Sequence, residues 1–173
     1  TKKGSFKSCY EFIKNMKNFW DTVNQVLKKA DIILLVLDAR FPEQTIHQEI
    51  IDKKGEKEII YVLNKADLVE TKTLKKWKRK FPHCIYMSAK EHEGTTILLR
   101  KILECAQGRK VSVAVVGYPN TGKSSVMNAL KGRKSASTSP HSGHTKAKQL
   151  VKITENVYLI DTPGVLPYLE KDA

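Results

Sequence analysis

Short apolar runs recur along the chain, and between them lie polar segments in which apolar residues stand three or four positions apart. A short apolar run between polar segments is typical of a buried strand, whereas the wider spacing predicts an amphipathic helix. The runs predict strands at residues 32–37, 59–63, 84–87, 111–116 and 157–160. The wider spacing predicts helices around Ile46, Ile50 and Ile51, around Leu74 and Trp77, and from Ile97 to Leu103.

Residues 8–29 form the longest helical pattern and precede the first strand. Ser8 and Glu11 have the spacing of a capping box, in which each side chain satisfies a backbone amide of the first turn. Apolar residues then follow along one face, at Ile13, Met16, Trp20, Val23 and Leu27. We expect an amphipathic N-terminal helix that packs on the rest of the domain.

Strands that alternate with helices predict right-handed crossovers and a mostly parallel sheet with helices on both faces. Residues 150–153 and the strand from Val157 flank a short polar turn, which predicts a hairpin and one antiparallel strand at the sheet edge. The expected fold class is α/β, a three-layer sandwich around a mostly parallel six-stranded sheet, in a single domain over residues 1–173. Residues 132–149 are polar, basic and turn-prone, and we expect them to be mobile without a ligand.

The composition narrows the class of partner. The chain has 173 residues, 40% of them hydrophobic, which suits one globular domain with a core. Lys and Arg number 31 against 18 Asp and Glu, so the net charge is +13. A polyanionic partner is favoured, because each neutralised phosphate releases counterions. RNA is the leading candidate, and a lysine-rich solvated surface is the alternative.

Cysteines and apolar runs indicate the compartment. Cys9, Cys84 and Cys105 are widely spaced and form no C-x-x-C pair, so we expect neither a disulfide partner nor a zinc site. The longest apolar run, at residues 32–37, is far too short to cross a bilayer. A cytoplasmic monomer without a membrane partner is expected.

The candidate binding motifs begin where the expected strands end. Asp38, Asn64, Ser88, Gly117 and Asp161 each follow directly on an apolar run. Open parallel sheets bind ligands along the carboxyl edge of their strands, so we expect these distant segments to meet in one crevice.

Residues 117–124 fit the phosphate-binding pattern G-x-x-x-x-G-K-[ST], between an apolar strand and a helical run. Glycines let backbone amides approach phosphate oxygens, Lys123 can reach the β- and γ-phosphates, and the Ser124 hydroxyl can ligate Mg²⁺. The expected phosphate-binding residues are Asn120, Thr121, Gly122, Lys123, Ser124 and Ser125.

Residues 64–67 read Asn-Lys-Ala-Asp and match the N-K-x-D pattern with which GTPases select guanine. The Asp67 carboxylate would accept hydrogen bonds from the guanine ring N–H and amine, and adenine cannot donate both. Each such bond is worth about 1.5–3 kcal/mol, so strong rejection of ATP is expected. The alternative is a polar turn that begins at Asn64. Ser88, Ala89 and Lys90 resemble the loop that supports guanine through a backbone amide, or form an ordinary strand exit.

Two segments would sense the γ-phosphate. Asp161-Thr162-Pro163-Gly164 resembles the D-x-x-G segment, in which Asp161 would bind the Mg²⁺ shell and the Gly164 amide would meet the γ-phosphate. A simple Pro-Gly turn is the alternative. Thr145 is the candidate for the switch threonine that contacts Mg²⁺, and an ordinary loop threonine is the competing interpretation.

The order of these motifs is unusual, because the guanine motifs precede the phosphate loop. Together with Asp38-Ala39-Arg40-Phe41-Pro42, the order resembles the circularly permuted ribosome-biogenesis GTPases, and the D-A-R-x-P segment is typical of the ribosome-biogenesis GTPase A group. The P-G-H-M segment of that group is missing from this sequence. The resemblance implies a Ras-like P-loop fold, GTP or GDP with Mg²⁺, GTP hydrolysis, and a ribosomal subunit precursor or rRNA as partner. In many members it implies a further C-terminal RNA-binding or helical domain, which we do not expect within these residues.

Catalysis would depend on Lys123, Thr145 and Gly164 around the γ-phosphate. Ras-like enzymes place a glutamine after D-x-x-G to orient the attacking water, and this chain has Val165 there. We therefore expect slow turnover that the ribosome stimulates. Asn120 resembles the asparagine of potassium-activated GTPases, so K⁺ is a further expected activator, unless Asn120 only shapes the turn.

Three smaller expectations concern charge. Arg40 is expected to pair with Asp38 at the sheet edge. Two basic clusters could contact RNA phosphates, one on the helix around Trp77 and one around residues 132–149; for the first, a solvated face with Trp77 packed inward is the alternative. The clusters comprise Lys72, Lys75, Lys76, Lys78, Arg79 and Lys80, and Lys131, Arg133, Lys134, Lys146, Lys148 and Lys152.

Two other functions remain open. The first is a nucleotide-gated RNA-binding or adaptor module with negligible turnover, which Val165 favours. The second is a GTPase that acts on tRNA or on signalling partners.

Overall fold

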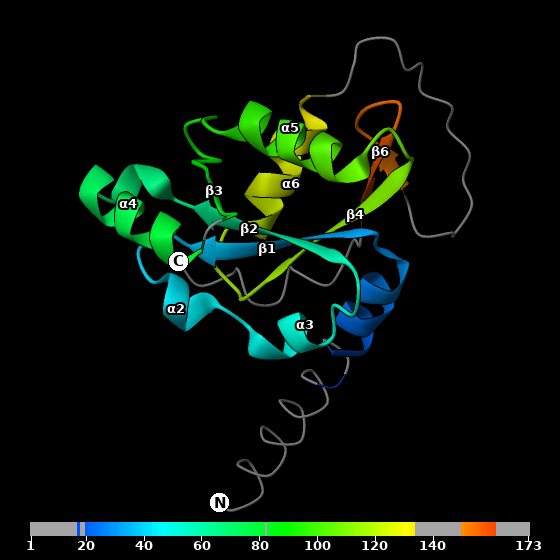
Figure 1. The fold of residues 1–173 in the computed structure, drawn as a ribbon, viewed down its shortest axis with the longest axis horizontal. Helices are drawn as coiled ribbons and strands as arrows, with labels where there is room; N and C mark the ends of the chain where they lie inside the picture. The colour runs from blue at the N-terminus through cyan, green and yellow to red at the C-terminus, as the bar shows by residue number, and fades with distance from the viewer. Residues whose placement is uncertain (1–16, 18–19, 82, 134–149, 162–173) are drawn as a thin grey trace, which may run out of the picture.

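The computed structural model describes Lys17 and residues 20–81, 83–133 and 150–161. A twisted sheet runs through the middle of the molecule, with helices above and below it (Figure 1). Six strands form the sheet, in the order β3-β2-β1-β4-β6-β5. They are β1 (Ile32–Asp38), β2 (Glu58–Asn64), β3 (Ile85–Tyr86), β4 (Val111–Gly117), β5 (Leu150–Lys152) and β6 (Val157–Ile160).

All strand pairs are parallel except β5 with β6, which is antiparallel and lies at the sheet edge. The predicted fold class is therefore confirmed, including the hairpin. Several strand boundaries differ from the predicted ones by one residue, and β3, predicted over residues 84–87, is only Ile85–Tyr86.

Strand β1 lies at the centre, and every one of its residues is buried. Its side chains alternate between the two faces of the sheet. Ile32, Leu34 and Val36 belong to the core on one face, and Ile33, Leu35 and Leu37 to the core on the other. A strand buried on both faces must be apolar throughout, which explains why this segment is a continuous apolar run rather than an alternating one.

The helices that cover the upper face in Figure 1 are α5 (Thr95–Ala106) and α6 (Lys123–Lys131). Leu98, Ile102 and Leu130 are fully buried there. Fully burying one such side chain is worth about 1.5–3 kcal/mol, so the inner faces of these helices hold them on the sheet.

The other face is covered by a helix over residues 20–29 and by α2 (Pro42–Thr45), α3 (Gln48–Asp52) and α4 (Thr71–Lys80). A short 3-10 turn, η1 (Ala66–Leu68), follows β2. Residues 20–29 bear out the described part of the predicted N-terminal helix, and residues 8–16, 18 and 19 lie outside the described residues. The single helix expected around Ile46–Ile51 is instead two short helices, because Ile46 has an extended backbone.

Two expectations from the sequence concern the cysteines and membrane-spanning segments. Cys84 and Cys105 carry free thiols, and Cys9 lies outside the described residues. Burial raises the pKa of both thiols, which lowers their reactivity. Within the described residues, the helices are too short or too polar to cross a membrane.

Candidate functional site at the carboxyl edge of the sheet

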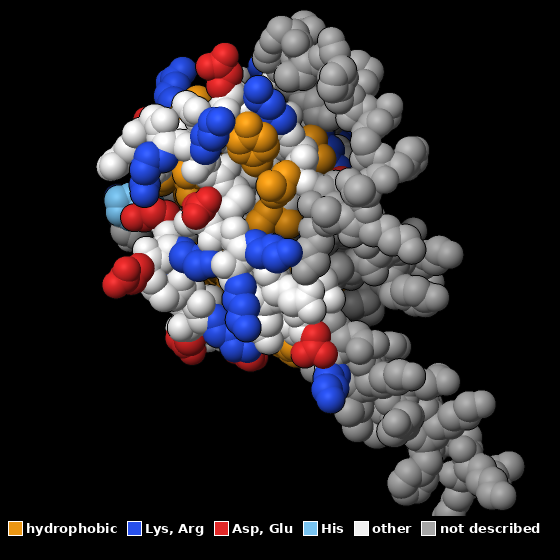
Figure 2. Space-filling view, turned by 90° about the vertical axis from the view of Figure 1, so that its right-hand side faces the viewer, with side chains coloured by type: hydrophobic (Ala, Val, Ile, Leu, Met, Phe, Trp, Pro, Cys, Tyr) orange, Lys and Arg blue, Asp and Glu red, His pale blue; other side chains and the backbone are white. Residues whose placement is uncertain are grey.

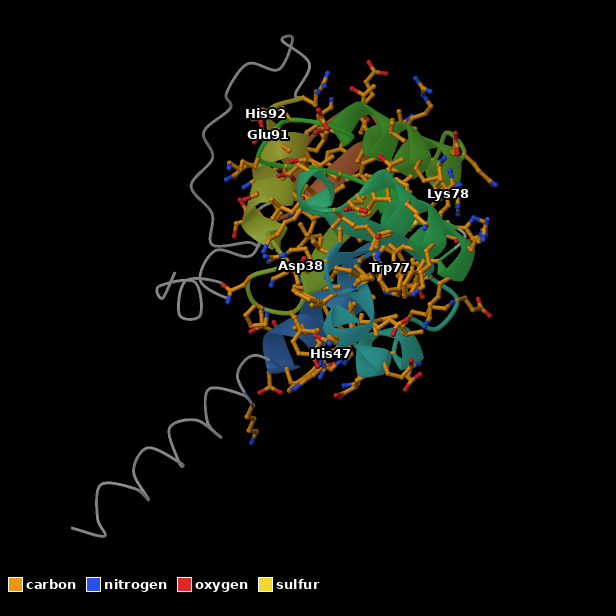
Figure 3. All side chains as sticks on the ribbon, turned by 90° about the vertical axis from the view of Figure 1, so that its left-hand side faces the viewer. Asp38, His47, Trp77, Lys78, Glu91 and His92 are labelled. Carbon is orange, nitrogen blue, oxygen red and sulfur yellow. The ribbon has the colours of Figure 1, made fainter. Side chains whose placement is uncertain are left out.

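The register of the strands brings the candidate motifs to one edge of the sheet. Asp38 at the end of β1 lies opposite Asn64 at the end of β2, and Val36 lies opposite Gly117, where the phosphate-loop motif begins. Leu63 pairs with Tyr86, so the Ser88–Lys90 loop leaves the sheet beside Asn64. These carboxyl ends lie toward the left of Figure 1 and face the viewer in Figure 3, where Asp38 is labelled.

Asn64 links three of these segments through one side chain, of which only 3% is exposed. Its Nδ2 donates to the carbonyl oxygen of Thr121 at 2.9 Å. Its Oδ1 accepts from the backbone N–H of Ala89 at 3.1 Å. An amide side chain carries both a donor and an acceptor, and both are needed here. The end of β2, the phosphate loop and the Ser88–Lys90 loop are therefore fastened together.

Gly122 allows this close approach. It has φ +88°, and a Cβ atom built on it would lie 2.2 Å from Asn64 Nδ2. A side chain there would displace the Asn64 amide, which two hydrogen bonds hold in place, so Asn64 itself favours glycine at position 122. This preference is additional to the close approach of the backbone to phosphate.

Lys65 bridges the phosphate loop and the end of β1. Its Nζ donates to the Asn120 carbonyl oxygen at 2.5 Å and lies 3.2 Å from Asp38 Oδ2. Lys65 and Asn120 both have φ +63°, in the left-handed region that asparagine tolerates better than most residues. The backbone turns at both points let the lysine side chain reach across.

Asp38 is the most heavily hydrogen-bonded carboxylate at this edge, and its side chain is 7% exposed. Oδ1 accepts from the Arg40 backbone N–H and from Arg40 Nε, both at 3.0 Å, and Oδ2 accepts from Arg40 Nη2 at 2.8 Å. Burial alone would raise the pKa of Asp38. The hydrogen bonds from Arg40 and Lys65 outweigh it and lower that pKa to about 2. The expected Asp38–Arg40 pair is confirmed.

The phosphate-loop residues lie where the motif predicts, between β4 and the first turn of α6. Lys123 is 3% exposed, and its Nζ donates to the Tyr118 carbonyl oxygen at 2.6 Å. Thr121 Oγ1 donates to the same oxygen at 2.8 Å. Ser124 and Ser125 follow Lys123 in the first turn of α6, where backbone N–H groups lack helical partners.

Tyr118 is linked to the N-terminal helix through His47. Its ring stacks on His47 with centroids 4.9 Å apart, and His47 meets Trp20 edge to face at 4.8 Å. Sequence reasoning missed this contact, because aromatic residues in three separate segments give no signal until the fold brings them together.

Asp161, which directly follows β6, pairs with a lysine of α6. Its Oδ2 lies 2.8 Å from Lys131 Nζ, and both side chains are partly exposed. Helix α6 thus carries Lys123 and Ser124 in its first turn and a partner of Asp161 at its other end. Thr145 and Gly164, with Thr162, Pro163 and Val165, lie outside the described residues.

A cavity of about 560 Å³ lies between the loop after β3, the start of α5 and one side of α6. It takes in Ala89, Lys90 and Ser125 of the predicted site. The remaining lining residues are His92, Thr95, Asn128, Ala129, Gly132 and Arg133. Asp67 is exposed on η1, after the turn made by Lys65.

Comparison with known proteins agrees with this arrangement. Residues 112–173 match the family model described as 50S ribosome-binding GTPase. A GTP-binding protein of Methanocaldococcus jannaschii is 48% identical over 157 residues, which cover 87% of this chain and 42% of the relative. Nucleolar GTP-binding protein 2 of Neurospora crassa is 38% identical over 169 residues, which cover 90% of this chain and 27% of that protein.

Solved structures give the fold relationship. GNP-bound YlqF from T. maritima superposes with a TM-score of 0.61 at 30% identity, over 84% of this chain and 57% of that one. The chain belongs to the circularly permuted GTPases of the YlqF type. YjeQ from Thermotoga maritima is a more remote match to this YlqF-type domain, with a TM-score of 0.52 at 26% identity over 79% of this chain and 49% of that one.

The YlqF-type assignment confirms the resemblance and the P-loop GTPase fold that the resemblance implied. The chain spans less than half the length of the two curated relatives. The assignment of individual residues to guanine, phosphate and metal remains a proposal. The geometry adds contacts that the motifs did not indicate, above all that of Asp38 with Lys65 and the stack of Tyr118 on His47.

Proposed function

We propose that this YlqF-type domain binds and hydrolyses GTP and acts in ribosome assembly, by binding a ribosomal subunit precursor or rRNA according to the nucleotide it holds. The observation that carries the proposal is the Asn64 side chain, which joins the guanine motif to the phosphate loop and to the Ser88–Lys90 loop. One nucleotide could span segments that are already in contact.

The phosphates would lie on residues 117–124, at the amino end of α6. The Lys123 ammonium now donates to the Tyr118 carbonyl oxygen and would turn to the β- and γ-phosphates. Thr121, Gly122, Ser124 and Ser125 would offer backbone N–H groups to the phosphate oxygens. The guanine base would lie between the Lys65 side chain and the Ser88–Lys90 loop, with Asp67 accepting its two N–H donors.

One detail of the guanine site departs from the simplest expectation. The Ala89 N–H already donates to Asn64 Oδ1, so the Lys90 N–H is the next donor along the loop that could meet the guanine carbonyl oxygen. Ala89 and Lys90 both line the 560 Å³ cavity, as Ser125 does from α6. The cavity would therefore receive the base and ribose end of the nucleotide.

The residues that would hold Mg²⁺ are Ser124, through its hydroxyl, Asp161 and Thr145. Hydroxyl and carboxylate oxygens are the hard donors that this ion prefers, and it seldom has an all-protein cage. When bound, it neutralises charge on the β- and γ-phosphates. Asp161 would exchange its contact with Lys131 for this role.

Hydrolysis would be slow in the isolated domain. Val165 cannot hydrogen-bond the attacking water, so a partner or a cation would have to supply that contact. We propose that the ribosome and K⁺ supply it, the latter near Asn120. GTPase rates measured with ribosomal subunits in KCl and in NaCl test the cation, and equal rates would remove K⁺ from the proposal.

Helix α4 offers the RNA-facing surface. Lys72, Lys75, Lys76 and Arg79 recur at the spacing of one helical face, and all are exposed. Leu74 and Trp77, which face the other way, pack against the core. The sequence of α4 contains no acidic residue. On the face of the molecule in Figure 2, by contrast, acidic side chains lie among the basic ones. Glu43 of α2 pairs with Lys80 beside this stripe. The cationic stripe of α4 suits phosphate contact without base readout.

The nucleotide assignment is tested by Asp67→Asn. The carboxylate pairs with the guanine amine and ring N–H, whereas an amide can pair with the extra carbonyl of xanthine. The variant should lose GDP and GTP affinity by orders of magnitude and gain affinity for xanthosine triphosphate, measured by titration of both nucleotides. Unchanged GTP affinity in a folded variant would refute the guanine assignment.

The partner assignment is tested by co-sedimentation with ribosomal subunits under GDP and under a non-hydrolysable GTP analogue. Binding only in the GTP form is expected. Lys72→Glu with Lys75→Glu should weaken the binding and flatten its salt dependence. Lys28→Glu with Lys110→Glu changes the net charge equally at exposed positions away from α4 and serves as the control. Equal losses in both pairs would assign the effect to net charge rather than to α4.

A nucleotide-gated RNA-binding module without turnover is the second candidate, favoured by Val165. It predicts the same nucleotide-dependent sedimentation, but phosphate release from GTP no faster than in the absence of this protein. A phosphate-release assay with subunits present therefore separates the two.

A further inference from the structure

Asp38 makes several contacts at the sheet edge to which the proposed function assigns no role. Its Oδ2 lies 3.2 Å from Lys65 Nζ, and the same Nζ donates to the Asn120 carbonyl oxygen. Lys65 is thus held from two sides, by the end of β1 and by the phosphate loop. A lysine has a flexible four-carbon stem, so its head stays in one place only where such partners fix it.

The orientation of the Asp38 carboxylate is itself fixed. Arg40 binds both of its oxygens through Nε and Nη2, and the planar guanidinium holds the carboxylate in its own plane. The Arg40 backbone N–H adds a third bond, and the Asp38 N–H donates to Thr45 Oγ1 at 3.0 Å. The carboxylate therefore has a single way to present Oδ2, and that direction leads to Lys65.

The charges also favour this arrangement. One carboxylate stands between a guanidinium and an ammonium, so the Asp38–Arg40–Lys65 group retains one net positive charge. Arg40 already supplies a bidentate partner for Asp38. The ammonium of Lys65 is thus positioned without losing its attraction for other electron-rich groups.

We propose that Asp38 is a positioning residue of the nucleotide site, which holds Lys65 against the phosphate loop so that the lysine side chain is ready to lie along the guanine base. This inference deepens the proposed function and rests on it. It also explains the D-A-R segment, because Asp38 orients Lys65 and Arg40 orients Asp38.

The test measures GDP affinity with a fluorescent GDP analogue in the full chain carrying Asp38→Asn. The amide keeps the size of the carboxylate but turns an N–H₂ group toward Lys65 if its oxygen stays with the Arg40 backbone. GDP binding should weaken about tenfold or more, as for the loss of one charge-assisted hydrogen bond. The preference for GDP over xanthosine diphosphate, set by Asp67, should stay unchanged.

Asp31→Asn is the matched control. Asp31 stands just before the other end of β1, and its Oδ2 accepts from the Ser112 N–H at 2.8 Å and from Ser112 Oγ at 2.9 Å. This variant also removes a hydrogen-bonded carboxylate next to β1, but at the opposite edge of the sheet. It should leave GDP affinity within about twofold of the wild type, because a substitution at a distant site seldom affects the contacts of another site.

Lys65→Met separates positioning from mere stability. If Asp38 acts through Lys65, then Asp38→Asn should lower GDP affinity much less in the Lys65→Met background than in the wild type. Its effect on stability against urea should remain in both backgrounds, because the contact between Asp38 and Arg40 is weakened in both. An equal fold-loss in both backgrounds, or unchanged affinity of Asp38→Asn, would overturn the inference.

The experiments distinguish failure of the proposed function from failure of the inference about Asp38. A wild-type chain that does not bind GDP would overturn the proposed function together with this inference. A wild type that binds GDP and responds to Asp67→Asn, with no affinity change in Asp38→Asn, would overturn only the role of Asp38.

Discussion

The contact between Asn64 and Gly122 predicts a coupled loss of stability. Asn64→Ala removes two buried hydrogen bonds and leaves the Thr121 carbonyl and the Ala89 N–H without that partner. A buried group left unsatisfied costs about 1–3 kcal/mol, so we expect a loss of about 2–6 kcal/mol for the two groups together. This would be a large share of the stability of a typical domain.

Gly122→Ala should act on the same bonds from the other side. Its Cβ would lie 2.2 Å from Asn64 Nδ2 and would push the amide out of place. The φ of +88° adds about 1–2 kcal/mol of backbone strain for alanine. In the double variant the clash is gone, because the Asn64 side chain is gone, and only the strain is added to the loss from Asn64→Ala. The two changes should therefore be less than additive by about 1–3 kcal/mol.

The measurement is urea unfolding of the wild type, both single variants and the double variant, followed by far-ultraviolet circular dichroism without nucleotide. Omitting nucleotide is essential, because a bound ligand would add its own stabilisation to the wild type. Similar m-values in all four proteins would show that the same surface is exposed on unfolding. Additivity within about 0.5 kcal/mol would refute the steric reasoning.

Three further predictions concern single side chains. The pKa of Asp38 is lowered from an ordinary 3.8 to about 2, so its charge stabilises the fold above pH 4. Relative to Asp38→Asn, the wild type should lose about 2 kcal/mol of unfolding free energy as the pH falls from 4 to 2. Urea unfolding at each pH measures this, and parallel stability curves for the two proteins would contradict it. Trp77 Nε1 is buried, and none of the described residues accepts a hydrogen bond from it. Trp77→Phe should therefore leave the free energy of unfolding within about 1 kcal/mol of the wild type or raise it. A loss above about 2 kcal/mol would show that this N–H has a hydrogen-bond partner. Lys131→Gln removes a partly exposed ion pair with Asp161 and should change stability by less than about 1 kcal/mol, while the Mg²⁺ concentration needed for half-maximal GTP binding should fall. A higher Mg²⁺ requirement would mean that Lys131 supports the metal site instead.

Much of the sheet could be predicted, because each strand is a separate apolar run with a polar end. The run at residues 157–160 matches β6 at both boundaries. Strand β1 extends one residue past its run, to Asp38, and β2 extends one residue at each end, from Glu58 to Asn64. The motif residues at those ends were also recognisable, since the carboxyl edge of a parallel sheet gathers them whatever their order in the chain.

The break between α2 and α3 could not be read from apolar spacing. Ile46, Ile50 and Ile51 would suit one helix as well as two. Thr45 decides the outcome: its Oγ1 donates to the Phe41 carbonyl oxygen at 3.1 Å and accepts from the Asp38 N–H. A threonine side chain that bonds nearby backbone competes with helix continuation, and here one partner lies on β1, which only the fold brings close.

The contacts within the site were hidden for the same reason. N-K-x-D marks Asn64 and Lys65 as guanine-site residues but does not indicate that each reaches the phosphate loop. Both contacts join a side chain to a backbone carbonyl across more than fifty residues, and backbone carbonyls leave no trace in sequence patterns.

The bond between Asn64 and Thr121 spans 57 positions of the chain, and this separation bears on how the protein matures. Contacts between remote segments form late, because closing a long loop costs chain entropy before any contact repays it. The contact between Asn64 and the phosphate loop would thus form only after β1, β2 and β4 have aligned, and a partly folded chain would lack a complete nucleotide site. Nucleotide capture would then report completed folding, and ligand supplied during refolding would trap the finished molecule without hastening its assembly.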